Sequence, residues 1–381
     1  MQNPEITLQQ GVRLTSIDLL RGIVIMLMAL DHTRDFFAPA TFDPLDWENG
    51  SAVWFWTRWI THLCAPIFVS LAGMAAFLRA QRFTRLDMSK YLFTRGFMLV
   101  VLEFTWVSFC WQFGFDFALL QVIWAIGVSM MVLSMLIWLP QRALIVIAIL
   151  LIVPHNLLDA WHEKNPGWWM KLWHQGGSVT IGDHFRIIFA YPLMPWIGLM
   201  TAGYAMGPVM RWGPTRRARF LVGSALLLFI IFIVLRSGNF YGDPDAWAHQ
   251  GKTWLVDLMS FVKVHKYPPS VLYLCITLSI GLAALMFLER YVHRPWSVLL
   301  LFGRHPLAFY MTHLFVIHGL AWVYMQIRYG AQINFHQGMV SQEYVPSLFV
   351  AYLAWGMVLL VMVGLLSIWQ HVQSHRRPPV L

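Results

Sequence analysis

The chain has 381 residues, of which 58% are hydrophobic and only 12% are charged, about half the charged share of a typical soluble protein. A water-soluble fold of this length is unable to bury so much apolar surface, so the composition excludes a soluble globular protein and indicates an all-α polytopic membrane protein. The formal net charge is +9, but the basic residues lie in short loops, which favours membrane orientation over nucleic-acid binding.

About ten segments are apolar enough to be membrane spans of roughly 20 residues each. In chain order they are 16–37, 55–78, 92–112, 117–139, 142–158, 186–210, 219–236, 270–289, 297–325 and 346–370. There is no convincing internal repeat, so residues 1–381 are predicted to form one transmembrane domain.

Basic residues gather in alternate loops, and the loops between them are acidic or mixed. The loops after the second and sixth spans carry Arg79, Arg82, Arg85, Lys90, Arg95, Arg211, Arg216, Arg217 and Arg219. The positive-inside rule therefore predicts that both termini are cytoplasmic. The first span then leaves the membrane on the outer side, at ALDHTRDFF (29–37).

The first span carries charges that are costly in a bilayer, about 2.5–3.5 kcal/mol each on insertion scales, so they are functional candidates. Helical periodicity places Asp18, Arg21, Ile25, Met28 and His32 on one stripe about 20 Å long, which must face the protein interior or a cavity. The stripe either lines a passage across the membrane or contains a neutralising ion pair between Asp18 and Arg21.

Two histidines are expected at the outer ends of the first two spans. His32 follows Asp31, and His62 lies at the same depth at the start of the second span. A histidine oriented by a carboxylate is suited to general-base catalysis. Adjacent residues of a helix point about 100° apart, so a partner from another helix is the alternative to Asp31. The structural alternatives are a polar helix exit for His32 and a buried packing role for His62.

Five further polar residues are candidates for binding a substrate or stabilising an oxyanion. Asn156 lies in PHNLLD at the end of the fifth span, and Lys266 and Tyr267 precede two prolines in KYPPS. Tyr310 and His313 are one turn apart in the ninth span. No metal is predicted, because the chain has no HxxEH or CxxC pattern; the alternative is a zinc site assembled from separate helices, which no pattern supports.

Several motifs together resemble the bacterial DUF1624 membrane family, which is similar to the catalytic domain of lysosomal heparan-alpha-glucosaminide N-acetyltransferase. They are RLTSIDLLRGIVIMLMALDHTRDFF, THLCAPIFVSLAG, LQVIWAIGVSMMVLS, PHNLLD, YPLMPWIGLMTAGYAMG, KYPPS and FGRHPLAFYMTHLFVIH, and they span about residues 13–325. The resemblance implies an acyltransferase of the bacterial inner membrane. Its donor would be cytoplasmic acetyl-CoA or another acyl-CoA, and its acceptor a sugar or glycan on the outer side.

The chain departs from the lysosomal enzymes at the catalytic position that the resemblance implies. Those enzymes are credited with a catalytic histidine in the loop after the first span, and this loop, FAPATFDPLDWENG, has none. His32 stands where they carry an asparagine. We therefore expect His32 to be the base, with Asp31 and His62 beside it, in preference to the loop acids Asp43, Asp46 and Glu48.

An acyl-CoA donor also needs cationic groups for its phosphates at the cytoplasmic side, although positive-inside loops carry such groups anyway. The candidate acyl-CoA-binding residues are Asp18, Arg21, Arg79, Arg82, Arg85, Arg95 and Arg304. The expected partners are membrane lipids, the small-molecule or glycan acceptor and a second copy in a homodimer. The alternatives are a proton-coupled transporter or exporter, which would use the same intramembrane groups as a relay, and a non-catalytic partner subunit.

Overall fold

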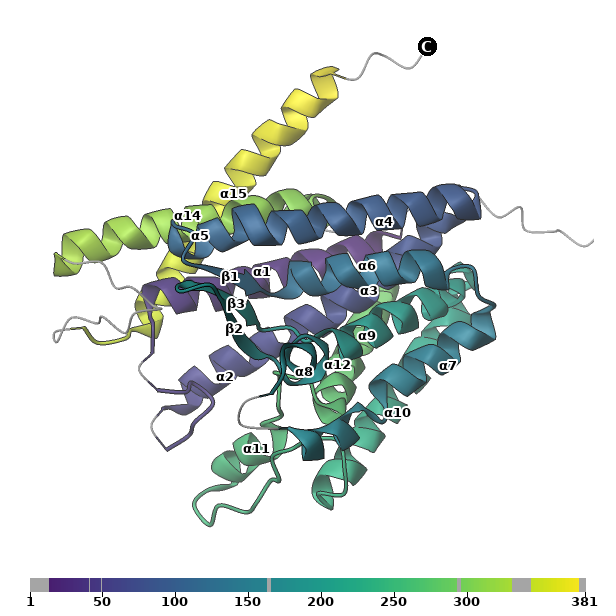
Figure 1. The fold of residues 1–381 in the computed structure, drawn as a ribbon, viewed down its shortest axis with the longest axis horizontal. Helices are drawn as coiled ribbons and strands as arrows, with labels where there is room; N and C mark the ends of the chain where they lie inside the picture. The colour runs from purple at the N-terminus through teal and green to yellow at the C-terminus, as the bar shows by residue number, and fades with distance from the viewer. Residues whose placement is uncertain are drawn as a thin grey trace, which may run out of the picture.

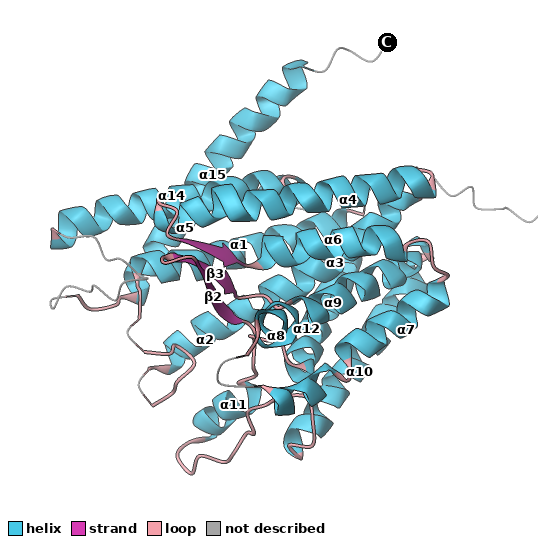
Figure 2. Ribbon diagram, viewed as in Figure 1, coloured by secondary structure: helices cyan, strands magenta, loops and turns pink. Residues whose placement is uncertain are grey.

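The computed structural model describes residues 14–40, 42–48, 50–162, 166–292, 296–330 and 344–376. The two chain ends, which the loop charges predict to be cytoplasmic, lie outside these ranges, so their side of the membrane stays a prediction. Most of the described residues are helical, and three short strands lie together beside the helices (Figures 1 and 2).

The helices are α1 (Thr15–Phe37), α2 (Ala52–Ile60), α3 (Cys64–Ala80), α4 (Arg85–Leu102), α5 (Ser108–Gln112), α6 (Val122–Leu136), α7 (Gln141–Ile152), α8 (Trp168–Met170), α9 (Leu193–Met206), α10 (Pro214–Ser237), α11 (Trp254–Val262), α12 (Val271–Tyr291), α13 (Ser297–Arg304), α14 (Pro306–Tyr329) and α15 (Leu348–Arg376). Five 3₁₀ or π turns adjoin them: η1 (Thr61–Leu63), η2 (Glu103–Val107), η3 (His155–Trp161), η4 (Lys171–Gln175) and η5 (Gly207–Arg211).

Seven helical segments of the described chain are long and apolar enough to cross a membrane. They are Ala52–Ala80, Arg85–Gln112, Gln141–Trp161, Pro214–Ser237, Val271–Tyr291, Pro306–Tyr329 and Leu348–Gln373. The three other predicted spans differ for physical reasons. Helix α1 has the length but carries five charges, whereas α6 and α9 have only 15 and 14 residues. The membrane class is confirmed, and the number of about ten spans stays a prediction.

The prediction of an all-α chain misses a three-stranded sheet. Strand β1 (Phe117–Leu120) pairs in parallel with β3 (Phe185–Phe189), and β2 (Gly177–Ile181) pairs antiparallel with β3. Two of the predicted spans, 117–139 and 186–210, therefore begin as strands and become helical only afterwards. Four or five apolar residues in a row fit a buried strand as well as a helix, so hydropathy alone does not separate the two.

The ninth predicted span, 297–325, is two helices. Helix α13 ends at Arg304, His305 takes a non-helical conformation, and α14 begins at Pro306. Proline lacks an N–H and fits the first turn of a helix but not its interior, so the helix is interrupted immediately before Pro306.

Helix α1 is the central helix of the bundle, and it packs against α3, α12, α13, α14 and α15. Two glycines allow α13 to approach it closely. A Cβ atom on Gly22 would lie 2.2 Å from the carbonyl oxygen of Leu299, and one on Gly303 would lie 1.8 Å from that of Asp18. This packing puts the end of α13 beside the first turn of α1.

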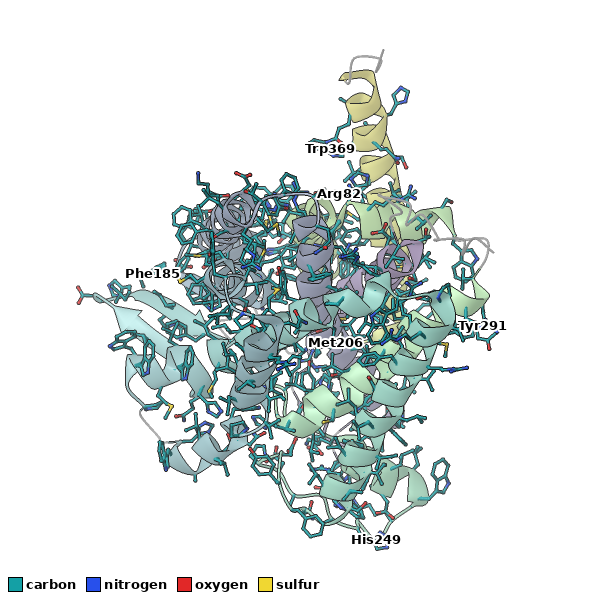
Figure 3. The ribbon with its side chains drawn as sticks, turned by 90° about the vertical axis from the view of Figure 1, so that its right-hand side faces the viewer. Arg82, Phe185, Met206, His249, Tyr291 and Trp369 are labelled. Carbon is teal, nitrogen blue, oxygen red and sulfur yellow. The ribbon has the colours of Figure 1, made fainter. Side chains whose placement is uncertain are left out.

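Helix α15 extends beyond the other helices. Its C-terminal part, with Trp369, projects from the bundle in two views at right angles (Figures 1 and 3). Trp369, Ile368 and Leu360 are exposed there, as expected of side chains that meet lipid.

The buried acid Glu103 connects the membrane helices to the sheet. Its carboxylate accepts hydrogen bonds from the backbone N–H groups of Gln121, at 2.8 Å, and Trp124, at 3.2 Å. These donors belong to the first turn of α6, where N–H groups lack helical partners and a negative charge is favourable. Glu103 thereby fixes the junction between β1 and α6.

Candidate active site

A pocket lies between α1, α3, α6 and α14, beside the loop that precedes α12. It contains about 680 Å³ of atom-free space, part of which is open to solvent. Five predicted site residues line it: Asp31, His32, Lys266, Tyr267 and Tyr310. The fold thus brings together groups from the first span, the KYPPS loop and the ninth span.

His32 is paired with His313, a histidine from a distant helix. Nδ1 of His32 lies 2.8 Å from Nε2 of His313, and the two rings are stacked. On its other side, Nδ1 of His313 lies 2.8 Å from the carbonyl oxygen of Tyr310 and 3.0 Å from that of Phe309. The partner that orients His32 is therefore the histidine from another helix and not Asp31.

The hydrogen bonds of the pair assign its protons. Carbonyl oxygens only accept hydrogen bonds, so Nδ1 of His313 carries the hydrogen, and Nε2 of the neutral ring is an acceptor. Nδ1–H of His32 then donates to that nitrogen. The remaining nitrogen of His32, Nε2, keeps its lone pair, has no hydrogen-bond partner among the described residues, and belongs to a ring that lines the pocket. This is the arrangement that a general base requires.

Asp31 is the centre of a charged cluster. Both of its carboxylate oxygens accept hydrogen bonds from Arg58, at 2.7 and 2.8 Å, and Thr61 donates to one of them at 2.8 Å. Arg34 lies 2.9 Å and Lys266 3.9 Å from the carboxylate. Asp31 thus holds three cations at the pocket, which fits the rule that buried charges are paired.

The cluster leaves a small excess of positive charge. Arg34 also pairs with Asp35, so three cations (Arg34, Arg58 and Lys266) face two carboxylates (Asp31 and Asp35). One net positive charge in a partly enclosed pocket favours bound or developing negative charge.

Tyr310 offers a hydroxyl without a hydrogen-bond partner. The residue is only 2% exposed, and its hydroxyl oxygen is buried and has no partner in the described part of the chain. An unpaired buried hydroxyl costs about 1–3 kcal/mol of folding free energy, so native proteins usually retain one only where it has a function or binds a water or ligand. Tyr310 lines the pocket, and its hydroxyl still has a hydrogen to donate.

The loop that carries Lys266 and Tyr267 is held in place by Arg236, at the end of α10. The buried guanidinium of Arg236 donates to four backbone carbonyls between residues 245 and 263. Asp243 accepts from the backbone N–H of His265, at 2.9 Å, and from the hydroxyl of Ser270, at 2.7 Å. The loop is therefore a positioned element with fixed hydrogen bonds at both ends of KYPPS.

Two predicted site residues lie away from the pocket. His62 is 1% exposed, and its ring nitrogens have no partner within the described residues. It packs edge-on against Tyr273, with ring centroids 5.6 Å apart, and does not line the pocket. Asn156 bridges the carboxylate of Asp159, at 2.7 Å, and the backbone N–H of Val271, at 2.9 Å. Both the NH₂ and the oxygen of its side-chain amide are therefore hydrogen-bonded outside the pocket.

The predicted acyl-CoA residues lie toward the other end of α1. Asp18 and Arg21 form an ion pair of 3.4 Å, and Arg21 also donates to the carbonyl of Leu71. Arg304 is close by, because Gly303 touches Asp18, and Arg79 stacks on the rings of Phe83 and Tyr91. Arg82, Arg85 and Arg304 are exposed, and Arg95 is half-buried.

The predicted stripe does not form a continuous passage. Met28 and His32 line the pocket, but Ile25 is completely buried, and Asp18 and Arg21 form an ion pair below it. The stripe does face the interior, as periodicity predicts, and the neutralising ion pair between Asp18 and Arg21 is present.

Four polar residues of the pocket wall escaped the sequence analysis: Arg58, Thr61, Gln121 and Tyr191. Arg58 had a signal, since an acid in the first span needs a cation and RWITHLC supplies one at the same end. Gln121 and Tyr191 follow the parallel strands β1 and β3, whose ends meet where the N–H of Tyr191 donates to Leu120 at 3.1 Å. Because the sheet was not predicted, nothing in the sequence indicated these two.

Comparison with known proteins agrees with this architecture. Residues 13–240 match the family model described as "Heparan-alpha-glucosaminide N-acetyltransferase, catalytic". The match covers α1 to α10, including His32, Asp31 and Arg58, and stops before the KYPPS loop and α14. No curated protein gives a significant match. Since the matched residues are more than half of the chain, and seven helical segments among the described residues are long and apolar enough to cross a membrane, the chain is an integral membrane protein that belongs to the heparan-alpha-glucosaminide N-acetyltransferase catalytic-domain family.

Proposed function

We propose that this protein is an acyl-CoA-dependent acyltransferase of the bacterial inner membrane. It would move an acetyl or acyl group from cytoplasmic acyl-CoA to an amine or hydroxyl of a sugar or glycan at the outer side. The observation that carries the proposal is that His32 lines the pocket while its Nδ1 is hydrogen-bonded to His313, which leaves Nε2 as the basic nitrogen. Family membership supports acetyl transfer as the reaction class.

In the proposed step, the amine or hydroxyl of the acceptor attacks the thioester carbonyl while Nε2 of His32 takes its proton. His313 stabilises the resulting imidazolium of His32 by accepting from Nδ1–H. The tetrahedral intermediate then collapses, the carbon–sulfur bond breaks, and the CoA thiolate takes the proton from His32. Acylated acceptor and free CoA leave, and no oxidant or metal is needed.

The negative oxygen of the intermediate needs hydrogen-bond donors that are already in place. Lys266 and Tyr310 both line the pocket, and the hydroxyl of Tyr310 has no partner in the described part of the chain. The net positive charge of the Asp31 cluster acts in the same direction. In this proposal Asp31 positions Arg58 and Lys266, and His32 alone among the predicted catalytic residues exchanges the proton.

The donor would be bound by cations at the far end of α1. Arg79, Arg82, Arg85 and Arg304 lie toward that end, and about 20 Å of helix separates Asp18 from His32, comparable to an extended pantetheine arm. Because buried Ile25 lies between the ion pair and the pocket, side chains around it must move aside when the arm enters.

The test uses the purified full-length protein in detergent and in proteoliposomes. Acetyl-CoA is supplied with a panel of amino sugars and glycans, and both free thiol and acetylated product are measured. We expect product with at least one acceptor, and His32→Gln should lower the rate by about 10²–10⁴-fold, the usual contribution of a general base. The matched control is His318→Gln, because His318 lies on the same helix as His313 but bonds to the carbonyl of Cys110 outside the pocket.

Two results would overturn the proposal. Unchanged turnover in His32→Gln would show that His32 is not the general base. Movement of an added solute across proteoliposomes without any thioester, and without thiol release when acetyl-CoA is added, would identify a transporter instead.

A further inference from the structure

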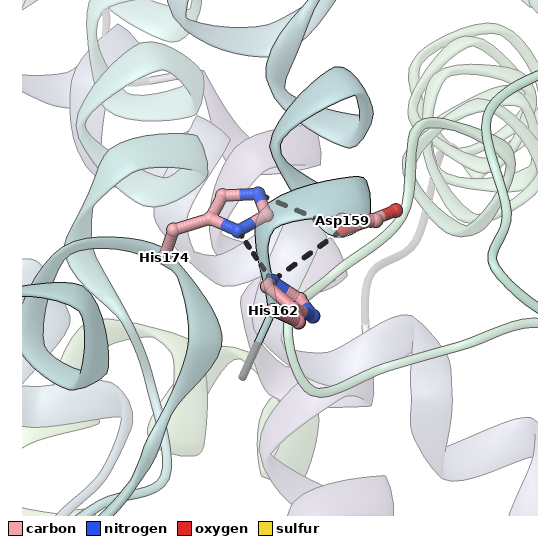
Figure 4. Close-up of side chains that lie close together, drawn as sticks. All are labelled: Asp159, His162 and His174. Atoms are coloured by element: carbon pink, nitrogen blue, oxygen red, sulfur yellow. Dashed lines mark hydrogen bonds and ion pairs between the residues drawn. The ribbon is translucent and has the colours of Figure 1, made fainter. Parts of the chain in front are cut away.

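A second cluster of ionisable side chains lies outside the pocket, where η3 meets η4. Asp159, His162 and His174 point toward one another there (Figure 4), and the donor atoms of the three all lie within 4.8 Å of each other. Nε2 of His162 is 2.8 Å from Nδ1 of His174, and Oδ1 of Asp159 is 3.7 Å from Nε2 of His162. The catalytic proposal uses none of these residues.

The carboxylate of Asp159 has one oxygen bonded and one oxygen free. Oδ2 accepts from the amide of Asn156 at 2.7 Å. Oδ1 is buried and has no hydrogen bond within the described residues, although both histidines are within 4 Å of it. A buried carboxylate oxygen without a donor is costly, and its position next to two imidazoles is suited to a ligand held between them.

We propose that Asp159, His162 and His174 bind a divalent transition-metal ion, with Zn²⁺ as the ion that this donor set fits best. The ligand atoms would be Oδ1 of Asp159, Nε2 of His162 and Nδ1 of His174. Two imidazoles and one carboxylate are a common zinc set, and three protein ligands leave the fourth tetrahedral position for water. His162 is partly exposed, with 24% of its side chain accessible, so an ion and its water can enter from that side.

The two spacings that involve His162 need only a small adjustment. Two nitrogens bound to a tetrahedral Zn²⁺ at about 2.0–2.1 Å lie about 3.3 Å apart. The two histidine nitrogens at 2.8 Å would therefore separate slightly, and the aspartate oxygen at 3.7 Å would approach.

The residues that contact the three proposed ligands could orient them, as the outer partners in metal sites do. His174 is fully buried, and its Nε2 lies 3.1 Å from Nδ1 of His155, so a hydrogen bond there directs the Nδ1 lone pair of His174 toward His162. Asn156 orients Asp159 and accepts from the backbone N–H of Val271 at the start of α12. Outer partners of this kind orient metal ligands in proteins. A bound ion would thus tie η3 and η4 to the helix that follows KYPPS.

The experiment measures metal binding directly on the full-length protein in detergent, after chelator treatment. Titration with Co²⁺ should give the visible d–d absorption of a four-coordinate ion at one equivalent per chain, and Zn²⁺ should displace it. Zn²⁺ should also raise the Tm of the protein, because a ligand that binds only the folded state stabilises it. Loss of a ligand in His162→Ala or Asp159→Asn should weaken binding by at least about 100-fold, beyond the 10–100-fold seen for outer partners.

His249→Ala is the matched control, since His249 is a largely exposed histidine that pairs with Asp257 on another loop. His162→Ala is preferred to His174→Ala because His174 is completely buried, so that its loss would also leave a cavity and disturb folding. Equal Tm values of His162→Ala and wild type without metal would show that the variant folds. Binding below half an equivalent, or binding unchanged in His162→Ala, would overturn the proposal and leave a hydrogen-bonded chain of imidazoles.

Discussion

His32 and His313 are 281 residues apart in the chain, yet their ring nitrogens Nδ1 and Nε2 lie 2.8 Å apart. The second histidine is itself anchored by two backbone carbonyls of α14. In serine hydrolases a buried acid fixes the tautomer of the catalytic histidine and stabilises its protonated form. Here a neutral histidine occupies the corresponding position behind His32.

The first prediction concerns His313 as a positioning residue. In His313→Gln, the side-chain carbonyl can still accept a hydrogen bond from Nδ1–H of His32. In His313→Leu, Nδ1–H of His32 has no acceptor. We expect kcat to fall by about 10²–10⁴-fold in the leucine variant, the range of general-base catalysis, and much less in the glutamine variant. KM for the acceptor should change little in both. Equal losses in the two variants would mean that His313 supports packing and does not orient His32.

The second prediction separates activity from stability at Tyr310. Tyr310→Phe removes a buried hydroxyl that has no partner, so the Tm should stay the same or rise, because an unsatisfied group costs about 1–3 kcal/mol. If the hydroxyl donates to the oxyanion, kcat should fall by about 10²–10³-fold. Thermal unfolding and thiol release in the same preparation measure both effects.

Tyr273→Phe is the matched control for Tyr310→Phe. The hydroxyl of Tyr273 donates to the carbonyl of His62 at 2.8 Å, outside the pocket. Its loss should lower stability by about 1 kcal/mol and leave kcat near the wild-type value. A Tyr310→Phe variant with normal kcat would remove this tyrosine from the catalytic proposal.

Sequence patterns located many of the site groups but not their partners. Helical periodicity placed Met28 and His32 on the interior face of α1, and both line the pocket. The partner of His32 depends on which helix packs against α1, and periodicity within one helix contains no information about its neighbours. The pairing of His32 with His313 therefore appeared only in the folded structure.

The three-stranded sheet was not predicted from the sequence for a different reason. Phe117–Leu120 and Phe185–Phe189 are too short and too uniformly apolar for hydropathy to distinguish strand from helix, and their parallel pairing joins segments far apart in the chain. That pairing brings Gln121 and Tyr191, which come just after the two strands, together in the pocket wall. Long-range pairing is the step that a single sequence does not specify.

The third prediction concerns the arginine that holds the KYPPS loop. Arg236→Leu leaves four backbone carbonyls without their donor and removes the cation 3.9 Å from Asp243. Breaking a buried ionic network typically costs about 3–5 kcal/mol, so the Tm should fall by several degrees. The control is Arg219→Leu on the same helix, where the side chain is exposed and the Tm should hardly change. A Tm of Arg236→Leu equal to that of Arg219→Leu would contradict the positioning role.

The fourth prediction uses the pH dependence of the same loop. Nδ1 of His265 lies 3.1 Å from the carboxylate of Asp245, and its Nε2–H donates to the carbonyl of Tyr267 at 2.9 Å. The hydrogen bond to Asp245 raises the pKa of His265 above its ordinary value, and the Asp243 carboxylate acts in the same direction. The same hydrogen bond lowers the pKa of Asp245.

A raised folded-state pKa means that the stability from protonated His265 is fully present below the ordinary value of about 6.5 and is lost as the pH rises through the folded value. The lowered pKa of Asp245 acts at the other end, since its contribution is lost only as the pH falls below about 4. The difference in Tm between wild type and His265→Gln should therefore be largest near pH 5–6 and shrink toward pH 9. His184→Gln, at an exposed histidine on the β2–β3 turn, provides the reference curve. A Tm difference for His265→Gln that is constant from pH 5 to pH 9 would show that the ion pair does not stabilise the loop that carries Lys266.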